Sequence, residues 1–316
     1  MTADHSLVHL MSRADTVLAK LEALLPPAAP DLDWNASTAF RWRRVAHGFT
    51  RRGFLQPVRH TAPIAFSNLK NIDRQKKAIE QNTRQFVAGR PANNVLLTGA
   101  RGTGKSSLIK ACLNQYAKKG LRLIEVDKSD LVDLPDIVDL IASRPERFIL
   151  FCDDLSFEEG ESSYKALKVA LDGSIAAPSE NVLIYATSNR RHLMPEQMRD
   201  NLATRHVDDG DGGVEIHPAD VVEEKISLSE RFGLWVSFYP FRQDEYLAIV
   251  AEWMAHLGCG DADIARAHDD ALRWALERGS RSGRVAWQFA RAWAGRHGSR
   301  ASSAGDVKTK GRARRS

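Results

Sequence analysis

Cysteine is scarce in this chain of 316 residues, which contains only Cys112, Cys152 and Cys259. An odd cysteine count without metal-ligand spacing argues against a disulfide framework and a zinc site, so we expect three reduced core residues. No apolar run approaches the ~18 residues of a membrane-spanning helix, and the start of the chain lacks the basic and apolar regions of a signal peptide. The sequence therefore predicts no membrane span and a cytoplasmic location.

Glycine and proline are also modest, at 21 and 12 residues, while 43% of the chain is hydrophobic and 27% is charged. This composition excludes a collagen-like, wholly disordered or disulfide-stapled protein. The length suffices for a large core and predicts two domains, at about 100 to 200 residues each.

Acidic residues are absent between Asp33 and Asp73, a stretch that holds seven basic residues. Residues 299–316 carry six basic residues and one acid, so the net charge of +5 belongs to two flanks. Basic flanks are able to bind nucleic acid through its phosphates, or to remain solvated arms. For the Ser-, Gly- and Arg-rich tail we favour disorder.

Aromatic and arginine residues interleave in the segment AFRWRRVAHGF, where Phe40, Trp42, Val45 and Phe49 are the apolar members. Two interpretations are open. The segment is either a base-stacking, phosphate-binding surface or an arm that packs its aromatic residues on the body and keeps its arginines in water. We favour packing.

Short apolar runs alternate with amphipathic helices through the middle of the chain, a pattern typical of a parallel sheet covered on both faces. A leader helix over 8–25 and a helix from an Asp73 N-cap to a stop at Gly89 precede this region. The predicted strands are 94–98, 121–126, 147–152, 181–187 and a fifth within the run GLWVSFYPF.

Beyond Pro240 the pattern is helical only, with three segments of apolar spacing near 3.6. The fold class that we predict is a five-stranded parallel α/β domain followed by a small all-helical domain. The predicted regions are a leader, linker and basic arm (1–67), the α/β domain (68–240), the helical domain (241–298) and a basic tail (299–316).

A glycine-rich loop between the first predicted strand and its helix matches the pattern G-x-x-x-x-G-K-[ST]. Such a loop turns backbone N–H groups toward phosphates, and the helix N-terminus adds a partial positive charge. We expect Lys105 to contact the β- and γ-phosphates and the Ser106 hydroxyl to ligate Mg²⁺. The predicted phosphate-binding residues are Gly99, Ala100, Arg101, Gly102, Thr103, Gly104, Lys105, Ser106 and Ser107.

Asp153 and Asp154 follow the third predicted strand, at the sheet edge where α/β proteins bind their ligands. Mg²⁺ prefers oxygen ligands, so we assign Asp153 to the metal, and Asp154 to orienting or deprotonating the attacking water.

With these motifs in order, residues 68–296 resemble the AAA+ ATPases, which implies a P-loop fold with a helical lid. The run YATSNRRHL resembles sensor 1 and makes Asn189 a contact of the attacking water. SLSERFGL resembles the arginine-finger segment, with Arg231 acting on a neighbouring subunit. SRSGRVAWQF resembles sensor 2, with Arg284 preferred and Arg281 in reserve. NLKNIDRQKKAI resembles the segment that closes over adenine, with Ile72 as a contact.

One position departs from the AAA+ pattern, because most members carry Asp-Glu where this chain has Asp153 and Asp154. The shorter side chain implies a slow, switch-like ATPase or recruitment of Glu158 or Glu159. The run NTRQFVAGRPANNVLLTGARGTGKSSLIKA together with RSGRVAWQF is more closely similar to a bacterial AAA+ family of unknown function.

The sequence thus predicts an Mg²⁺-dependent, ATP-binding, homo-oligomeric ATPase that remodels or loads a macromolecular client. The alternative is a slow or non-hydrolysing, nucleotide-gated scaffold that binds nucleic acid or an acidic protein. Phosphoryl transfer to a small molecule is disfavoured, because no dedicated substrate-pocket motif is present.

Overall fold

The computed structural model describes residues 11–18, 32–47, 50–157, 161–172, 179–189, 228 and 230–297. The chain divides into two compact units, Met1–Tyr239 and Pro240–Ser316. Of the predicted leader helix, residues 11–18 are helical and exposed, and its remainder lies outside the described residues, as do Gly173 and the tail.

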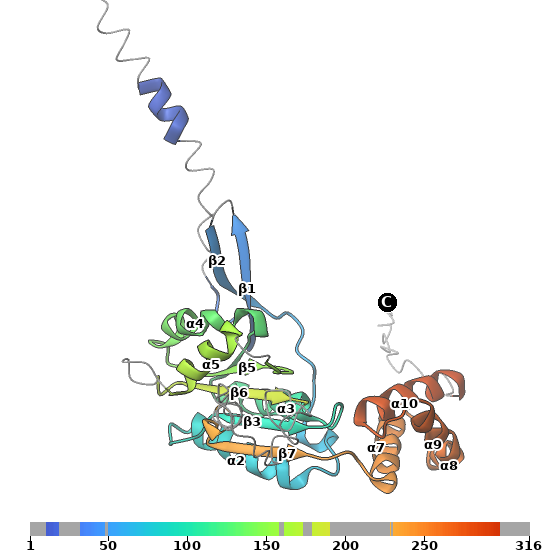
Figure 1. Ribbon diagram of the computed structural model, residues 1–316. Helices are drawn as coiled ribbons and strands as arrows, with labels where there is room; N and C mark the ends of the chain where they lie inside the picture. Colours follow the sequence, from blue (N-terminus) through green and yellow to red (C-terminus); the bar gives the residue numbers. More distant parts are fainter. Residues whose placement is uncertain are drawn as a thin grey trace, which may run out of the picture. The chain divides into compact units, whose positions relative to one another are not determined.

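The first unit is built on a seven-stranded sheet in the order β2-β1-β4-β5-β6-β3-β7 (Figure 1). The prediction of five parallel strands is confirmed, since β4, β5, β6, β3 and β7 pair in parallel. The strands are β1 (Ala39–His47), β2 (Thr50–Pro57), β3 (Val95–Gly99), β4 (Leu121–Glu125), β5 (Arg147–Cys152), β6 (Val182–Ser188) and β7 (Leu234–Phe238).

Helices and 3-10 turns connect these strands. They are η1 (Phe66–Asn68), α2 (Asp73–Val87), α3 (Lys105–Tyr116), η2 (Ala117–Lys119), η3 (Lys128–Asp133), α4 (Leu134–Ile141) and α5 (Ser162–Asp172). The predicted N-cap of α2 was wrong by one residue, because Ile72 takes the cap position and Asp73 starts the helix. An acid in the first turn still interacts favourably with the helix dipole.

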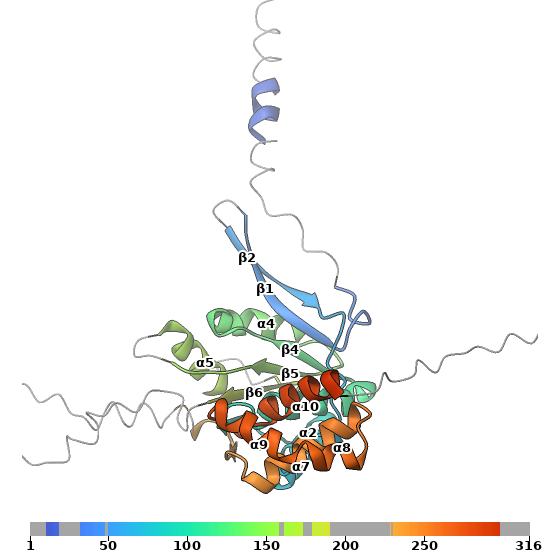
Figure 2. The same cartoon turned by 90° about the vertical axis from the view of Figure 1, so that its right-hand side faces the viewer.

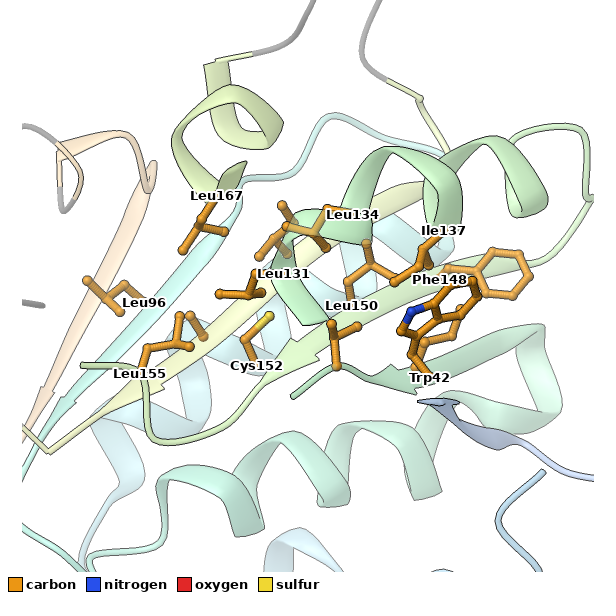
Figure 3. Packing of buried hydrophobic residues seen from close by; sticks show 14 of the residues in the cluster. Trp42, Leu96, Leu131, Leu134, Ile137, Phe148, Leu150, Cys152, Leu155 and Leu167 are labelled. Atoms are coloured by element: carbon orange, nitrogen blue, oxygen red, sulfur yellow. The ribbon is translucent and has the colours of Figure 1, made fainter. Parts of the chain in front are cut away.

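The main core lies between alternate residues of the strands and the helical segments η3, α4 and α5. Figure 3 shows Phe148, Leu150 and Cys152 of β5 close to Leu134 and Ile137 of α4. All of these side chains are fully buried, and each large aliphatic or aromatic one contributes about 1.5–3 kcal/mol of transfer free energy. The apolar residues that recur every second position in the strand thus pack against those that recur about every 3.6 positions in the helix, and together they form one apolar layer.

The three cysteines are buried and unpaired, as expected. Burial raises the pKa of the Cys112 and Cys152 thiols to about 12, so both stay protonated near neutral pH. Cysteine chemistry therefore has no part in the sites described below.

The basic arm forms the antiparallel pair β1 and β2, and this is a correction, because no strands were predicted there. β1 adds to the sheet by pairing in parallel with β4 over Ala39 to Arg41, and then runs on with β2 beyond that edge (Figure 2). Phe40 and Trp42 point into the core and are 0% and 4% exposed, whereas Val45 on the opposite face is 48% exposed. The packing interpretation is confirmed for the two aromatic residues; Phe49 lies outside the described residues.

Acidic residues of the body pair with the arginines of β1. Arg41 contacts Glu125 at 2.6 Å, and Arg44 contacts Asp133 at 2.5 Å. Hydrogen bonds from Ser129, and to a lesser extent the charge of Arg43, lower the pKa of Asp127. Two of the three arginines of β1 thus anchor it to β4 and η3, which weakens the case for a nucleic-acid surface at these two positions.

The regular secondary structure in the described part of the second unit, residues 240–297, is helical only, with α7 (Gln243–His256), α8 (Asp261–Arg266), α9 (His268–Glu277) and α10 (Gly283–His297). The second of the three predicted helices is in fact two, because the helix is interrupted at Ala267, between α8 and α9. α7 packs on α10 and on α9, and buries Tyr246 and Val250 as their spacing predicted. Within the described residues, no helix has both the length and the apolar character that a membrane crossing requires.

The carboxylate of Asp133 accepts several hydrogen bonds from β1 of the hairpin formed by β1 and β2. We therefore expect Asp133→Ala to lower the free energy of unfolding by about 2–3 kcal/mol. Its carboxylate accepts hydrogen bonds from Trp42 Nε1 at 2.8 Å and from Arg44 Nε and Nη2 at 2.5 Å. The side chain makes no helix-cap hydrogen bond, so the loss would measure the hairpin contact. Urea unfolding followed by near-UV circular dichroism gives this value.

The matched control is Asp130→Ala, because Asp130 lies 3.4 Å from Arg44 Nε and should cost less than about 1 kcal/mol. The hydrogen bond from Arg44 lowers the pKa of Asp133, so its contribution is present above the ordinary carboxyl pKa and is lost as the pH falls through the lowered value. Equal losses for the two variants would show that Asp133 is not the anchor.

Candidate functional site

The glycine-rich loop connects β3 to α3 through left-handed backbone that only glycine adopts easily. Gly99 has a φ of +122°, and a Cβ at this position would lie 1.8 Å from the carbonyl oxygen of Phe238 on β7. Gly104, the N-cap of α3, has a φ of +99°. The loop is therefore set in shape by its glycines and by the neighbouring strand.

Ile72 lies against the far end of this loop. A Cβ on Gly104 would be 3.5 Å from Ile72 Cδ1 and 3.9 Å from Leu69 Cδ2. Ile72 is 4% exposed. The segment before α2 thus packs beside the start of α3, and the contact of Ile72 with adenine stays a prediction.

Lys105 is the best-connected side chain of the site. Its Nζ donates to the carbonyl oxygens of Gly99 and Ala100 at 2.6 and 2.8 Å, and to Asn189 Oδ1 at 3.0 Å. An ammonium group has three N–H donors, so these partners use all of them. Burial lowers the pKa of Lys105 to about 8, although the charges of Asp153 and Asp154 oppose the shift.

Asp153 lies where β5 ends and faces the first turn of α3. Its Oδ1 accepts hydrogen bonds from Ser106 Oγ and from Thr187 Oγ1, both at 2.6 Å. Carboxylate and hydroxyl oxygens are ligands that Mg²⁺ accepts, and it completes its shell with water and phosphate. In the described ranges, no group of three or more His, Cys, Asp or Glu residues is placed to hold a metal ion.

Asp154 adopts a left-handed backbone, with a φ of +54°. Its carboxylate accepts a hydrogen bond from Asn189 Nδ2 and lies 3.8 Å from Arg101 Nη2, while its N–H donates to Thr187 Oγ1 at 2.9 Å. Asn189, at the end of β6, thereby contacts both Lys105 and Asp154. The structure brings together the predicted residues from the ends of β3, β5 and β6.

Among the other predicted residues, Arg231 of the first unit lies away from this cluster. Arg231 precedes β7 and pairs with Asp172 at 2.5 Å. Because Leu234 is in register with Val95 and the loop begins at Gly99, Arg231 lies at the opposite edge of the sheet, about 13 Å or more from the loop at ~3.3 Å per residue. Arg284 and Arg281 belong to the second unit and are exposed; Glu158 and Glu159 lie outside the described residues.

Thr187 is the residue that sequence reasoning missed. It is 1% exposed and contacts both aspartates. The signal was present in the run YATSNRRHL, where a hydroxyl residue near the end of a buried strand needs a polar partner.

The sheet order β7-β3-β6-β5-β4, with a phosphate-type loop after β3 and paired acids after β5, defines a P-loop protein of the AAA+ type with a helical second unit. The chain belongs to the family described as "Protein of unknown function (DUF815)", whose sequence profile matches residues 35–297.

Among characterised proteins, the ATP-dependent zinc metalloprotease FtsH of Syntrophobacter fumaroxidans is 27% identical over 174 residues. This match covers 46% of the chain and 26% of FtsH, so the chain spans about a quarter of that relative.

Two solved structures resemble the chain at low identity. The RuvB Holliday junction branch migration motor of Thermotoga maritima has a TM-score of 0.38 at 14% identity, covering 74% of this chain and 72% of that one. A chain of the HORMA:CdnC:Trip13 complex of E. coli MS115-1 has a TM-score of 0.44 at 11% identity, covering 72% and 89%.

The lowered pKa of Lys105 predicts that affinity for a nucleoside triphosphate falls above pH 8, because only the ammonium form attracts phosphate. Titration calorimetry with ATP between pH 7 and 9.5 should show Kd rising by up to about tenfold per pH unit in the alkaline part. Folding does not account for this loss, since a lysine with a lowered pKa favours the folded state more as the pH rises from about 8 to 10.5.

The control is Lys105→Arg, in which the guanidinium stays charged over the whole range and the profile should be flat. A wild-type profile as flat as that of the variant would contradict a role for Lys105 titration.

Proposed function

We propose that this protein binds ATP with Mg²⁺ and hydrolyses it slowly as a homo-oligomer, coupling the cycle to the remodelling or loading of a macromolecular client. The observation that carries the proposal is one connected set of hydrogen bonds at the ends of three neighbouring strands. It joins Lys105 to Asn189, Asn189 to Asp154, and Asp153 to Ser106. The Thr187 hydroxyl connects Asp154 with Asp153 and completes the set.

Phosphate binding is supported by the loop and by Lys105. The loop ends at the N-terminus of α3, a helix of 12 residues whose first N–H groups have no partner within the helix. Lys105 supplies a buried positive charge beside it. Buried charge and aligned N–H groups at one place favour a polyanion such as a triphosphate.

Ser106 and Asp153 would hold the magnesium ion. When bound there, the ion would neutralise charge on the phosphates. Thr187 keeps the Asp153 carboxylate oriented through its hydrogen bond.

Hydrolysis is supported by the position of Asp154 and Asn189. A carboxylate able to accept a proton and an amide able to orient water lie side by side, with Lys105 on the other side of the amide. Arg101 Nη2 lies 3.8 Å from Asp154 Oδ2, the carboxylate oxygen that Asn189 does not contact.

Arg231 supports oligomerisation, because it lies at the sheet edge opposite the loop of its own subunit. A guanidinium stabilises negative charge that develops on a transferred phosphoryl group, provided that it reaches one. From this place only the nucleotide of a neighbouring copy would be within reach. Arg284, with Arg281 in reserve, is proposed to complete the site from the helical unit.

The client is a macromolecule, and nucleic acid is one candidate through the basic tail 299–316. A second function, a nucleotide-gated scaffold for nucleic acid or an acidic protein, is favoured by the short Asp154 carboxylate at the place of the expected base. Under that function, Asp154→Asn would leave partner release intact. Formation of a phosphorylated small molecule, in place of free phosphate, would instead point to phosphoryl transfer.

Asp154→Asn tests hydrolysis directly. Asn tolerates the left-handed backbone and has the same length, so we expect ATP affinity within about twofold of wild type. Loss of the base should lower kcat by about 100-fold or more. Phosphate release under single-turnover conditions measures this rate.

Lys105→Ala is the companion variant and should lose ATP binding. Wild-type turnover in Asp154→Asn would exclude Asp154 as the base. A wild-type protein without affinity for ATP, with or without Mg²⁺, would overturn the whole proposal.

Arg231→Ala should abolish the rise of specific ATPase activity with protein concentration and lower kcat by about 1,000-fold or more, while ATP binding is retained. Activity is measured across a protein dilution series, with the assembly state followed by light scattering. Asp172→Asn is the matched control, because it removes the negative charge paired with Arg231 but keeps the guanidinium. If Asp172→Asn is as inactive as Arg231→Ala, the ion pair and not a shared site explains the effect.

A further inference from the structure

A single side chain, Thr187, connects the two aspartates that follow β5. Its Oγ1 lies 2.6 Å from Asp153 Oδ1 and 2.9 Å from the backbone N of Asp154. Thr187 is on β6, just past the last parallel pair of the two strands, Cys152 with Ala186. The hydroxyl thus continues the contact between β5 and β6 where their backbone ladder ends.

The direction of these two hydrogen bonds is fixed by chemistry. An ionised carboxylate only accepts, and a backbone N–H only donates. The Thr187 hydroxyl therefore donates its one proton to Asp153 and accepts from Asp154. Because both hydrogen bonds of the Thr187 hydroxyl have a defined direction, its hydrogen has one favourable orientation.

Three further bonds tie the same turn to β6. Leu155 N donates to the backbone oxygen of Thr187 at 2.7 Å, and Ser188 Oγ donates to the oxygen of Leu155 at 2.7 Å. The third is the bond from Asn189 Nδ2 to the carboxylate of Asp154. The left-handed conformation of Asp154 is unfavourable by itself for a residue with a Cβ, and persists where its surroundings fix it.

We propose that Thr187 is a positioning residue, whose hydroxyl holds the Asp153 carboxylate toward Ser106 and fixes the left-handed turn that directs Asp154 at Asn189. The kinetic part of this proposal rests on the proposed ATPase function; the structural part does not. The left-handed turn also accounts for aspartate at this position, because Asp adopts that conformation more readily than Glu and its short carboxylate already reaches Asn189.

The structural test is hydrogen exchange at single amides, measured by NMR on the full chain without nucleotide. In Thr187→Val the Asp154 N–H loses its acceptor, and its exchange should become at least about tenfold faster. The Leu155 N–H donates to the Thr187 backbone, which the substitution leaves in place, so it is an internal control and should change by less than about twofold.

The kinetic test compares Thr187→Val with Thr187→Ser. Loss of the hydroxyl should lower kcat for ATP by about tenfold or more with KM nearly unchanged, and Ser should restore most of kcat. If Thr187→Val does not fold, Thr187→Cys and Thr187→Ser form the pair, because a thiol of similar size is a weak donor and acceptor.

The proposal would be overturned if the Asp154 amide of Thr187→Val exchanged its hydrogen as slowly as that of the wild type. In the second pair, the same exchange rate in Thr187→Cys and Thr187→Ser would overturn it. Equal kcat for the hydroxyl and non-hydroxyl variants of an active enzyme would overturn it as well. A wild-type chain that does not hydrolyse ATP would refute the proposed function and leave the exchange measurement to decide the role of Thr187.

Discussion

The parallel pairing of β3, β5 and β6 is the constraint on which the site depends. Parallel strands end at the same edge, so strand pairing alone brings the loop after β3, the acids after β5 and the amide after β6 close enough to form their hydrogen bonds. Gly99 makes this arrangement possible, because its lack of a side chain lets β7 pass directly beside the start of the loop. The apolar layer of η3, α4 and α5 then keeps β5 in place beneath the site.

Much of this arrangement was predictable from the sequence, because the strands, the loop and the acids are local patterns. The hairpin was not predicted, although Phe40 and Trp42 do alternate with arginines as in a half-buried strand. Arginines in such a segment favour the prediction of a solvent-exposed arm, because their acidic partners cannot be identified from the local sequence. Those partners, Glu125 and Asp133, are more than 80 residues away along the chain. The break at Ala267 was equally hidden, since α8 and α9 share a continuous helical pattern.

The same limit applies within the site. The P-loop motif and the paired acids predict which residues meet, but the left-handed backbone of Asp154 follows from tertiary hydrogen bonds with β6. The Asp154 side chain is one methylene shorter than that of glutamate. This difference in length alone therefore does not determine the distance between its carboxylate and its partners. Backbone conformation compensates for side-chain length here, because it turns the shorter group toward Asn189.

In the proposed ATPase, the hydrogen bonds of Lys105 would link the binding of a phosphate to the surroundings of Asp154. All three N–H groups of the ammonium are in use, on two loop carbonyls and on Asn189. A phosphate that takes one of these N–H groups has to displace one of the three acceptors. Displacing Asn189 would free its amide from Lys105 while its Nδ2 still faces Asp154, which is the position from which an amide orients water. Under the proposed function, phosphate binding at the loop and the release of the Asn189 amide beside Asp154 would then result from the same exchange of hydrogen bonds.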